Sequence, residues 1–377
     1  MNADTKTFRS AVVDRVRASG GVWELPGGQI LLPRVFGFCR GVTRALAMLE
    51  RAVADKARTG KRLFLLGQII HNPWVNDHFR ACGVRVLSPE QMTDLSGVIA
   101  PDDCAVVPAF GVPLAIEEQL RRIGCEIVDT TCGDVRRLWA WACRAAQDGF
   151  GVLIYGRASH DETVVTKSRL EAAGGRYLVV GELDEARRFC DMVEAGDDDA
   201  SPKEKFGADA SNADSLQPFC RLAQVSQTTM LYDETTQVRG MIRSAFVRRF
   251  GAEEAARRLL LQPTVCRATQ QRQAAAGELC EAGCHLVIVV GGFGSSNTRH
   301  LYELARQRGP AYFIEDASGV ISGEALRAFD AKRNSAAEIR DWLPKARPLK
   351  VGVLAGASSP EIVVGEVLCR LAELLSS

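Results

Sequence analysis

The chain has 377 residues, 46% of them hydrophobic, and a formal net charge of +1. This length exceeds that of a single ordinary core, so we expect two or three domains. The balanced charge provides no basic field for a nucleic-acid partner or an anionic membrane surface. No apolar run reaches the roughly 18 residues that span a membrane, and the N-terminus lacks the apolar core of a signal peptide. We therefore expect a cytoplasmic protein with no membrane partner.

The hydrophobic pattern predicts an N-terminal extension followed by three αβ units of similar make-up. The extension covers residues 1–28, and the units cover 29–125, 126–263 and 264–377. Strands are expected at 30–32, 63–66, 84–86, 105–107, 126–129, 152–155, 177–180, 222–225, 286–290, 312–314 and 350–354, and helices include 43–56, 72–82 and 114–123. Strands that alternate with helical patterns imply mostly parallel sheets covered on both faces.

One segment breaks this alternation. Residues 195–216 are rich in Asp, Ala and Ser and have no apolar period. Such composition predicts a disordered or solvated insertion in the second unit. We expect a tolerated surface loop rather than a regulatory element.

Three of the twelve cysteines stand at predicted strand-to-helix turns. Cys39 follows a short apolar run and precedes a helical pattern, and Gly37 and Gly41 allow a sharp bend around it. Cys132 and Cys266 lie in similar settings in the other two units. Because the first amides of a helix stabilise a thiolate, each position suits a metal ligand or a nucleophile. We hypothesise that the three thiolates converge on one iron–sulfur cluster.

The other nine cysteines lie in helix or strand patterns, where a free cysteine behaves as a small apolar residue. A large cytosolic chain is an unlikely place for a disulfide framework. Cys280 and Cys284 are four residues apart on a predicted helix, and we favour packing over metal binding for them. No Cys-x-x-Cys pair occurs, which argues against a zinc ribbon or a thioredoxin-type site.

Small and polar residues follow several predicted strands, where ligands bind in open α/β sheets. The turns after 286–290 and 350–354 are rich in glycine and serine and resemble anion sites built from backbone N–H groups and hydroxyls. Simple helix capping explains any single one of these residues equally well. The candidate residues of the two turns are Ser295, Ser296, Asn297, Ser358 and Ser359.

Two histidines and one carboxyl group lie on the other turns. His71 and His160 together with the two serine-rich turns favour a phosphate or diphosphate ligand, although a loop histidine alone is more often solvated or part of a core. Glu162 follows two residues after His160 and is placed to donate a proton. An acidic residue at the start of a helix is also common without any catalytic role.

Taken together, these segments resemble the 4-hydroxy-3-methylbut-2-enyl diphosphate reductases, the LytB/IspH family, from Ile30 to about Leu374. The matching segments occur in the family's order. They are Gly37–Ala45, Ile70–Val75, Asp129–Cys132, Gln227–Thr229, Cys266–Gln273, Ser295–Thr298 and Ala355–Ser358.

The resemblance implies three αβ lobes in a pseudo-threefold (trefoil) arrangement around a central 4Fe-4S cluster. Cys39, Cys132 and Cys266 would hold the cluster and leave one iron open to the substrate. The reaction implied is reductive removal of an allylic hydroxyl, with a ferredoxin or flavodoxin as electron donor. Glu162 would deliver the proton and Thr228 would orient the hydroxymethyl group, and His160 is the third residue of the implied catalytic set. The diphosphate would be bound by His71, His160, Ser295, Ser296, Asn297, Ser358 and Ser359.

The chain departs from the family pattern at four positions. Phe110 replaces a diphosphate-facing histidine, Gly133 replaces a proline, and Gly294 replaces an asparagine. The family's Gly-His-x-Gly-His-Pro-Glu segment reads Gly156–Glu162 here and contains Arg157 as a candidate compensating cation. Loss of one hydrogen bond to a charged oxygen costs roughly 1.5–3 kcal/mol, so we expect weaker diphosphate binding unless another group compensates.

Three functions remain open at this point. The first is the family's reductase activity. The second is a divergent paralogue with reductive or dehydrative chemistry on a different substrate, which Phe110 and Gly133 favour. The third is a non-catalytic redox sensor that bears the cluster. Retention of Glu162 and Thr228 argues against the sensor, which would need only the three cysteines.

Overall fold

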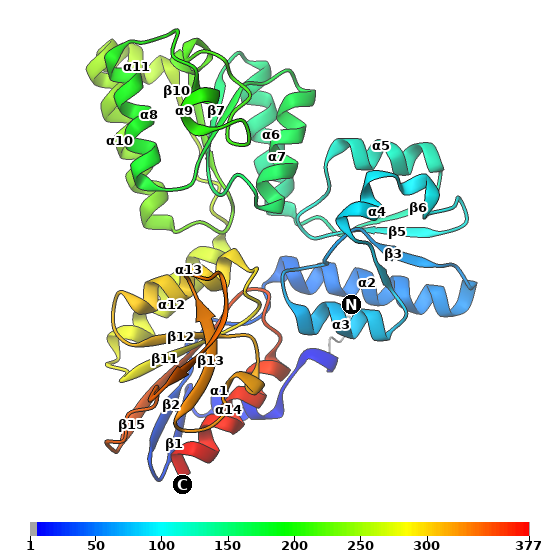
Figure 1. Cartoon of the computed structure of the whole chain (residues 1–377), viewed down its shortest axis with the longest axis vertical. Coiled ribbons are helices and arrows are strands. Elements are labelled where there is room, and N and C mark those ends of the chain that lie inside the picture. The colour runs from blue at the N-terminus through cyan, green and yellow to red at the C-terminus, as the bar shows by residue number, and fades with distance from the viewer. Residues whose placement is uncertain (1–5, 377) are drawn as a thin grey trace. The chain divides into compact units, whose positions relative to one another are not determined.

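Figure 1 shows the computed structural model, which describes residues 6–376. The chain divides into two compact units. The first contains the residues up to Arg58, Gln68–Val86 and the residues from Arg267 onward, and the second contains Thr59–Gly67 and Leu87–Cys266. Within the two units, eight of the described strand pairings are parallel and two are antiparallel. The predicted α/β class with mostly parallel sheets is thereby confirmed.

The first unit is built on a five-stranded sheet in the order β1-β2-β15-β11-β12. The strands are β1 (Val22–Leu25), β2 (Gly28–Leu31), β15 (Leu349–Ala355), β11 (Leu286–Val290) and β12 (Ala311–Ile314). The inner strand β11 is fully buried because both of its faces are covered, which is why its sequence is an uninterrupted apolar run. One face packs on α14 (Glu361–Ser376), whose Val363, Val367 and Leu371 belong to the largest core cluster.

The first unit also contains further helices, a short strand and a separate hairpin. The helices are α1 (Ala11–Ala18), α2 (Arg40–Thr59), α3 (Pro73–Ala81), α12 (Arg267–Glu281) and α13 (Ser296–Arg306), and the short strand β4 spans Arg85–Val86. A separate antiparallel hairpin, β13 (Ala325–Asp330) with β14 (Ser335–Arg340), was not predicted from the sequence. In β14 every residue is exposed or half-buried, so no apolar pattern in the sequence indicated this strand.

Residues 6–28, which the sequence marks as an extension, are integrated into this unit. The strand β1 pairs with β2 in an antiparallel manner at the edge of the sheet. On α1, Val13 and Val16 are buried in the same core cluster as α14. Ser10 lies so close to α14 that a Cβ added at Gly365 would be 2.0 Å from its hydroxyl oxygen.

The second unit contains two parallel sheets. One has the order β10-β9-β7-β8, formed by β10 (Leu259–Leu261), β9 (Leu222–Ser226), β7 (Gly151–Tyr155) and β8 (Tyr177–Val180). On one face it packs on α8 (Leu183–Ala195) and α10 (Tyr232–Phe250), and on the other on α6 (Gly133–Gln147) and α7 (Asp161–Ala172). The other sheet contains β3 (Leu63–Leu65), β5 (Cys104–Val107) and β6 (Glu126–Asp129). The shorter helices are α4 (Pro89–Thr93), α5 (Leu114–Ile123), α9 (Pro202–Phe206) and α11 (Ala252–Arg258).

The segment 195–216 differs from the disordered insertion that its composition predicts. It contains α9, and Ser211 is fully buried with its hydroxyl donating to the carbonyl of Tyr177 at 2.7 Å. Asn212 accepts from the N–H of Tyr177 at 2.9 Å and donates to the carbonyl of Gly175 at 3.0 Å. Since β8 is an edge strand, its free backbone groups need partners. Polar side chains of the segment provide them, which a search for apolar periodicity does not detect.

Among residues 6–376, no helix combines the length and the apolar character needed to cross a membrane.

Candidate active site

All three singled-out cysteines directly precede a helix. Cys39 lies before α2, Cys132 is the N-cap of α6, and Cys266 lies before α12. Each is a half-buried cysteine. Cys39 belongs to the first unit and the other two to the second, and within residues 6–376 no three Cys, His, Asp or Glu side chains are grouped as a metal-ion site. Convergence of the three thiols on one cluster therefore stays a prediction.

Several other cysteines are poor candidates for ligands because burial raises their pKa. Burial raises the pKa of Cys190 to about 12 and that of Cys284 to about 11. The pKa values of Cys125, Cys143 and Cys280 are also raised, chiefly by burial. Since the thiolate is the species that binds metals, these side chains suit the packing role expected for them.

The loop that carries Cys39 is held from two sides. The N–H of Cys39 donates to the carbonyl of Ala357 at 3.3 Å, and its Sγ accepts the N–H of Val42 at 3.4 Å. The buried side chain of Arg272 donates twice to the carbonyl of Gly37, at 3.1 Å and 2.7 Å. Gly37 has φ +69°, which favours glycine at this bend. Arg272 is a supporting residue that the sequence did not single out.

Cys132 is fixed by the neighbouring strand end. Its N–H donates to the carbonyl of Ala109 at 2.8 Å, as expected from the pairing of β5 with β6. Phe110 follows Ala109 directly, and Gly111 packs so tightly on the ring of Trp139 that an added Cβ would be 2.3 Å from it. Phe110, which replaces a histidine of the family pattern, therefore lies beside the predicted cluster ligand Cys132.

Glu162 and Thr228 form a buried pair in the second unit, only 3% and 5% exposed. The N–H of Thr228 donates to Oε1 of Glu162 at 2.6 Å, and its hydroxyl donates to Oε2 at 2.6 Å. The carbonyl of Thr228 accepts the N–H of Cys266 at 3.0 Å. His160 caps α7, and its Nδ1 accepts the N–H of Glu162 at 3.2 Å. Four predicted residues of this unit are thus joined by hydrogen bonds.

The side chain of Gln227 holds the two turns of this network together. Its Oε1 accepts the N–H of Arg157 at 3.1 Å, and its Nε2 donates to the hydroxyl of Thr229 at 2.7 Å. A Cβ at Gly156 would be 2.8 Å from the Cβ of Gln227, so glycine permits this close approach. Gln227 is buried, with only 1% of its surface exposed. Its role depends on the hydrogen bond to Arg157, which is 70 positions away in the chain. The sequence alone does not show this pairing.

The serine-rich turns after β11 and β15 lie together in the first unit because these strands are parallel neighbours with Val290 opposite Ala355. The hydroxyl of Ser358 donates to Oγ of Ser295 at 3.0 Å, and Oδ1 of Asn297 accepts the N–H of Ala357 at 2.9 Å. Five predicted side chains are buried here: Ser295, Ser296, Asn297, Ser358 and Ser359. Ser359 donates to the carbonyl of Val290 at 2.7 Å, so its hydroxyl hydrogen is engaged within the fold.

His71 lies close to the same turns. A Cβ at Gly294 would be 3.8 Å from the Cβ of His71, and one at Gly292 would be 2.5 Å from its carbonyl oxygen. The buried side chain of Asn76 shapes the His71 turn by accepting from the N–H of Ile69 and donating to the carbonyls of Ile70 and Asn72, at 3.0, 2.9 and 2.7 Å. Asn76 was not singled out from the sequence.

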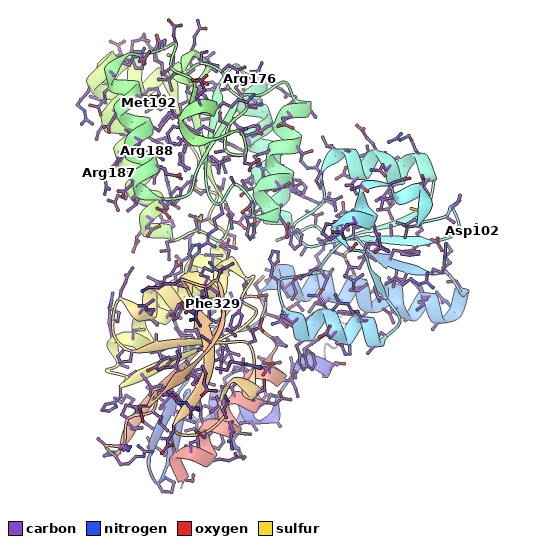
Figure 2. The ribbon with its side chains drawn as sticks, viewed as in Figure 1. Asp102, Arg176, Arg187, Arg188, Met192 and Phe329 are labelled. Atoms are coloured by element: carbon purple, nitrogen blue, oxygen red, sulfur yellow. The ribbon has the colours of Figure 1, made fainter. Side chains whose placement is uncertain are left out.

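Aromatic packing anchors the turn that precedes Ser295. Phe293 packs on Phe313 and on Phe329 of β13, with ring centroids 5.1 and 5.3 Å apart. Phe329 is labelled in Figure 2. These contacts fix the backbone of the turn, because a buried aromatic cluster resists displacement.

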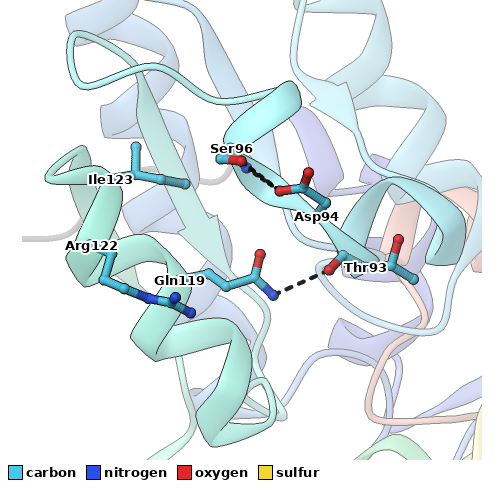
Figure 3. A pocket seen from close by; sticks show the side chains of 6 residues that line it. All are labelled: Thr93, Asp94, Ser96, Gln119, Arg122 and Ile123. Carbon is cyan, nitrogen blue, oxygen red and sulfur yellow. Dashed lines mark hydrogen bonds between the residues drawn. The ribbon is translucent and has the colours of Figure 1, made fainter.

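The surface hollow of Figure 3 is lined by none of these residues. Its volume is about 490 Å³, and it is lined by Thr93, Asp94, Ser96, Gln119, Arg122 and Ile123. The amide of Gln119 is engaged within the fold, because its oxygen accepts the N–H of Leu95 at 2.9 Å and its nitrogen donates to the carbonyl of Thr93 at 3.4 Å. No predicted site residue lines this hollow.

The donor set fits an iron–sulfur cluster in kind, because cysteine thiolates are the ligands that such clusters use and all three cysteines lie at helix starts. Fold and site together define a mostly parallel α/β protein with thiol donors at helix starts and hydroxyl-rich turns at strand ends. The family model described as LytB protein matches residues 30–372. The chain belongs to this LytB family.

Relatives of the chain support this assignment. The protein of Gloeobacter violaceus named 4-hydroxy-3-methylbut-2-enyl diphosphate reductase is 36% identical over 97% of this chain and 88% of its own length. The protein of the same name from Thermosynechococcus vestitus is 35% identical over 98% of this chain and 90% of its own length.

Solved structures give the same picture. That of (E)-4-hydroxy-3-methyl-but-2-enyl diphosphate reductase is similar with a TM-score of 0.55 and 25% identity, covering 91% of this chain and 99% of its own. That of the E-1-hydroxy-2-methyl-but-2-enyl-4-diphosphate reductase from Plasmodium falciparum has a TM-score of 0.64 at 20% identity, covering 91% of this chain and 87% of its own. The second likeness supports the fold alone.

Proposed function

We propose that this protein removes the allylic hydroxyl of 4-hydroxy-3-methylbut-2-enyl diphosphate with two electrons and two protons, giving isopentenyl and dimethylallyl diphosphates. The observation that carries the proposal is the 36% identity to a reductase of this name over nearly the whole chain. The buried Glu162–Thr228 pair supports it, because it supplies a carboxyl group and a hydroxyl at the start of α7.

The cofactor in this proposal is a 4Fe-4S cluster held by Cys39, Cys132 and Cys266, with one iron open to the substrate. When bound, it would supply the electrons and a Lewis acid for the hydroxyl oxygen. A ferredoxin or flavodoxin is the proposed electron donor, and a cytoplasmic location stays a prediction.

The chain's own residues would bind the substrate and move the proton. Glu162 would deliver the proton from its carboxyl group, whose two oxygens are held by Thr228. Because Nδ1 of His160 accepts a backbone N–H, its neutral ring carries the proton on Nε2 and can donate it to an anionic oxygen. His71, Ser295, Ser296, Asn297 and Ser358 are the proposed diphosphate donors, and Ser359 would act by holding the turn.

Neither rival function is favoured. The relatives carry the reductase name at 35–36% identity over 97–98% of this chain, which gives no support to a paralogue with a different substrate. A cluster-bearing sensor would not need the buried Glu162–Thr228 pair. Phe110 and Gly133 are therefore treated as variations within a reductase.

The test is turnover of 4-hydroxy-3-methylbut-2-enyl diphosphate by anaerobically purified protein with a strong one-electron donor. We expect both isoprenoid diphosphates, separated by chromatography because they are isomers of equal mass and then detected by mass spectrometry. We also expect loss of iron together with activity in Cys39→Ser, Cys132→Ser and Cys266→Ser. The matched control is Cys82→Ser, since Cys82 is exposed and lies outside the predicted ligand set. Iron-loaded protein that forms neither product would contradict the proposal.

A further inference from the structure

Phe8, in the part of the chain that precedes the family match, is inserted between two functional loops of the first unit. Its side chain is 2% exposed. The ring lies edge-on to Phe38 and to Trp74, with centroid distances of 5.5 and 5.9 Å. Phe38 directly precedes Cys39, and Trp74 lies in the first turn of α3, directly after the His71 turn.

Arg17 holds the other end of the Cys39 loop. Its guanidinium donates to Oε1 of Glu361 at 2.6 Å and lies 5.2 Å from the centroid of the Phe36 ring. Phe36 and Phe38 flank Gly37, whose carbonyl is held by Arg272. The N-terminal segment therefore contacts the loop on both sides of its bend.

The contact with α3 extends to His71 through Asn76. Phe8 also packs on His78 and Phe79 of this helix, at 5.3 and 6.3 Å between centroids. Asn76 binds three backbone groups of residues 69–72, so three hydrogen bonds connect the helix to the His71 turn. A shift of α3 would be passed to His71.

We propose that Phe8 and Arg17 form an N-terminal clamp that fixes the Cys39 loop relative to the His71 turn. Phe8 is the central positioning residue, because its ring touches both the residue before Cys39 and the helix after His71. The sequence pattern predicted that this segment is an N-terminal extension. In the structure it packs against the neighbours of two predicted site residues, Cys39 and His71. The clamp itself is a property of the fold, and its value for turnover rests on the proposed function.

Hydrogen exchange of the purified chain, read by mass spectrometry, tests the clamp without any substrate. In Phe8→Ala we expect exchange at residues 36–43 and 69–76 to rise about tenfold or more, because a segment opens more readily when fewer buried apolar groups pack on it. Phe8→Leu keeps an apolar side chain and should show a smaller rise. Arg9→Ala is the matched control, since Arg9 is exposed on the same segment.

A second control separates local positioning from general loss of stability. Phe219 is fully buried in the core of the second unit, and Phe219→Ala should not raise exchange at 36–43 and 69–76 selectively. A selective rise at both loops in Phe8→Ala supports the clamp. An unchanged rate at either loop, or an equal rise throughout the first unit, overturns it.

The consequence for the site is measured in the loaded enzyme. In Phe8→Ala we expect a changed electron paramagnetic resonance signal of the reduced cluster, together with a higher KM. If exchange rises at both loops but wild-type protein makes no isoprenoid diphosphate, the clamp stands and the proposed function fails. If the wild type is active and the loops of Phe8→Ala exchange as in the wild type, the clamp alone fails.

Discussion

Glu162 receives two hydrogen bonds from a single residue, because Thr228 offers its backbone N–H to one carboxyl oxygen and its hydroxyl to the other, both at 2.6 Å. The two residues are 66 positions apart and are both buried. A carboxyl group held by two donors of one residue has a single orientation. The same Thr228 binds the N–H of Cys266 through its carbonyl, so the proposed acid and a proposed ligand share one support.

The first prediction concerns the proton of Glu162. In Glu162→Gln the amide oxygen can still accept the N–H of Thr228, and the amide nitrogen can donate to the Thr228 hydroxyl, which accepts as well as donates. The fold should therefore be preserved while the acidic proton is lost. We expect turnover to fall about 10²–10⁴-fold, the usual contribution of a general acid, with unchanged iron content. Wild-type turnover in this variant would exclude Glu162 as the proton donor.

The second prediction separates the two donors of Thr228. Thr228→Val removes the hydroxyl and leaves Oε2 of the buried Glu162 without that donor, which costs about 1–3 kcal/mol of stability. Thr228→Ser retains the hydroxyl and should behave nearly as the wild type in urea unfolding and in turnover. Equal stability of the valine and serine variants would show that the hydroxyl bond contributes nothing.

Fold elements with an uninterrupted apolar run could be predicted from the sequence. Both β7 and β11 are buried on two faces, and their positions were found within one residue. The strand β14 was missed because it is exposed or half-buried along its whole length. Apolar periodicity reports burial, so it cannot find a strand that buries almost nothing.

Only part of the candidate site could be predicted from the sequence, and the reason is similar. Strand ends are visible in a sequence, and the turns after β11 and β15 followed from that rule and from the parallel pairing it implies. The supports of the site were not visible, because Gln227 and Asn76 act through hydrogen bonds to backbone groups. A buried amide that binds backbone leaves no periodic pattern, and only the tertiary structure shows which turn it holds.

The third prediction tests Asn76 as the support of the His71 turn. Asn76→Ala leaves three backbone groups of residues 69–72 without this partner, and we expect a loss of about 2–5 kcal/mol in the free energy of unfolding. Turnover should also fall through a higher KM for the diphosphate substrate. Asp77→Ala is the control, because Asp77 is an exposed neighbour on the same helix. A stable Asn76→Ala variant with normal KM would contradict this role.

The fourth prediction concerns stability at alkaline pH. Burial raises the pKa of the Cys190 thiol to about 12 from its ordinary value of 9.0, so above pH 9 the unfolded chain loses a proton that the folded chain keeps. The contribution to stability is complete below pH 9 and is lost as the pH rises toward 12, by about 1.4 kcal/mol per pH unit. Urea unfolding under reducing conditions should show a shallower alkaline slope in Cys190→Ala than in Cys82→Ala. Parallel slopes would mean that Cys190 ionises equally in both states.

The last prediction addresses Gly133, where the family pattern has proline. Gly133 is the first residue of α6, a position that accepts proline because its N–H has no partner within the helix. The preceding Cys132 has φ −62° and ψ 139°, which is the conformation that a following proline requires. A Cβ added at Gly133 would meet no heavy atom of other residues within 4 Å. Gly133→Pro should therefore raise the free energy of unfolding by about 0.4–1 kcal/mol, because proline lowers the conformational entropy of the unfolded chain. The iron content should be unchanged.

Gly133→Ala is the matched variant with a side chain but no ring. If Gly133→Pro destabilises the protein and Gly133→Ala does not, the backbone at this position needs a conformation that proline cannot adopt. The prediction would then be wrong.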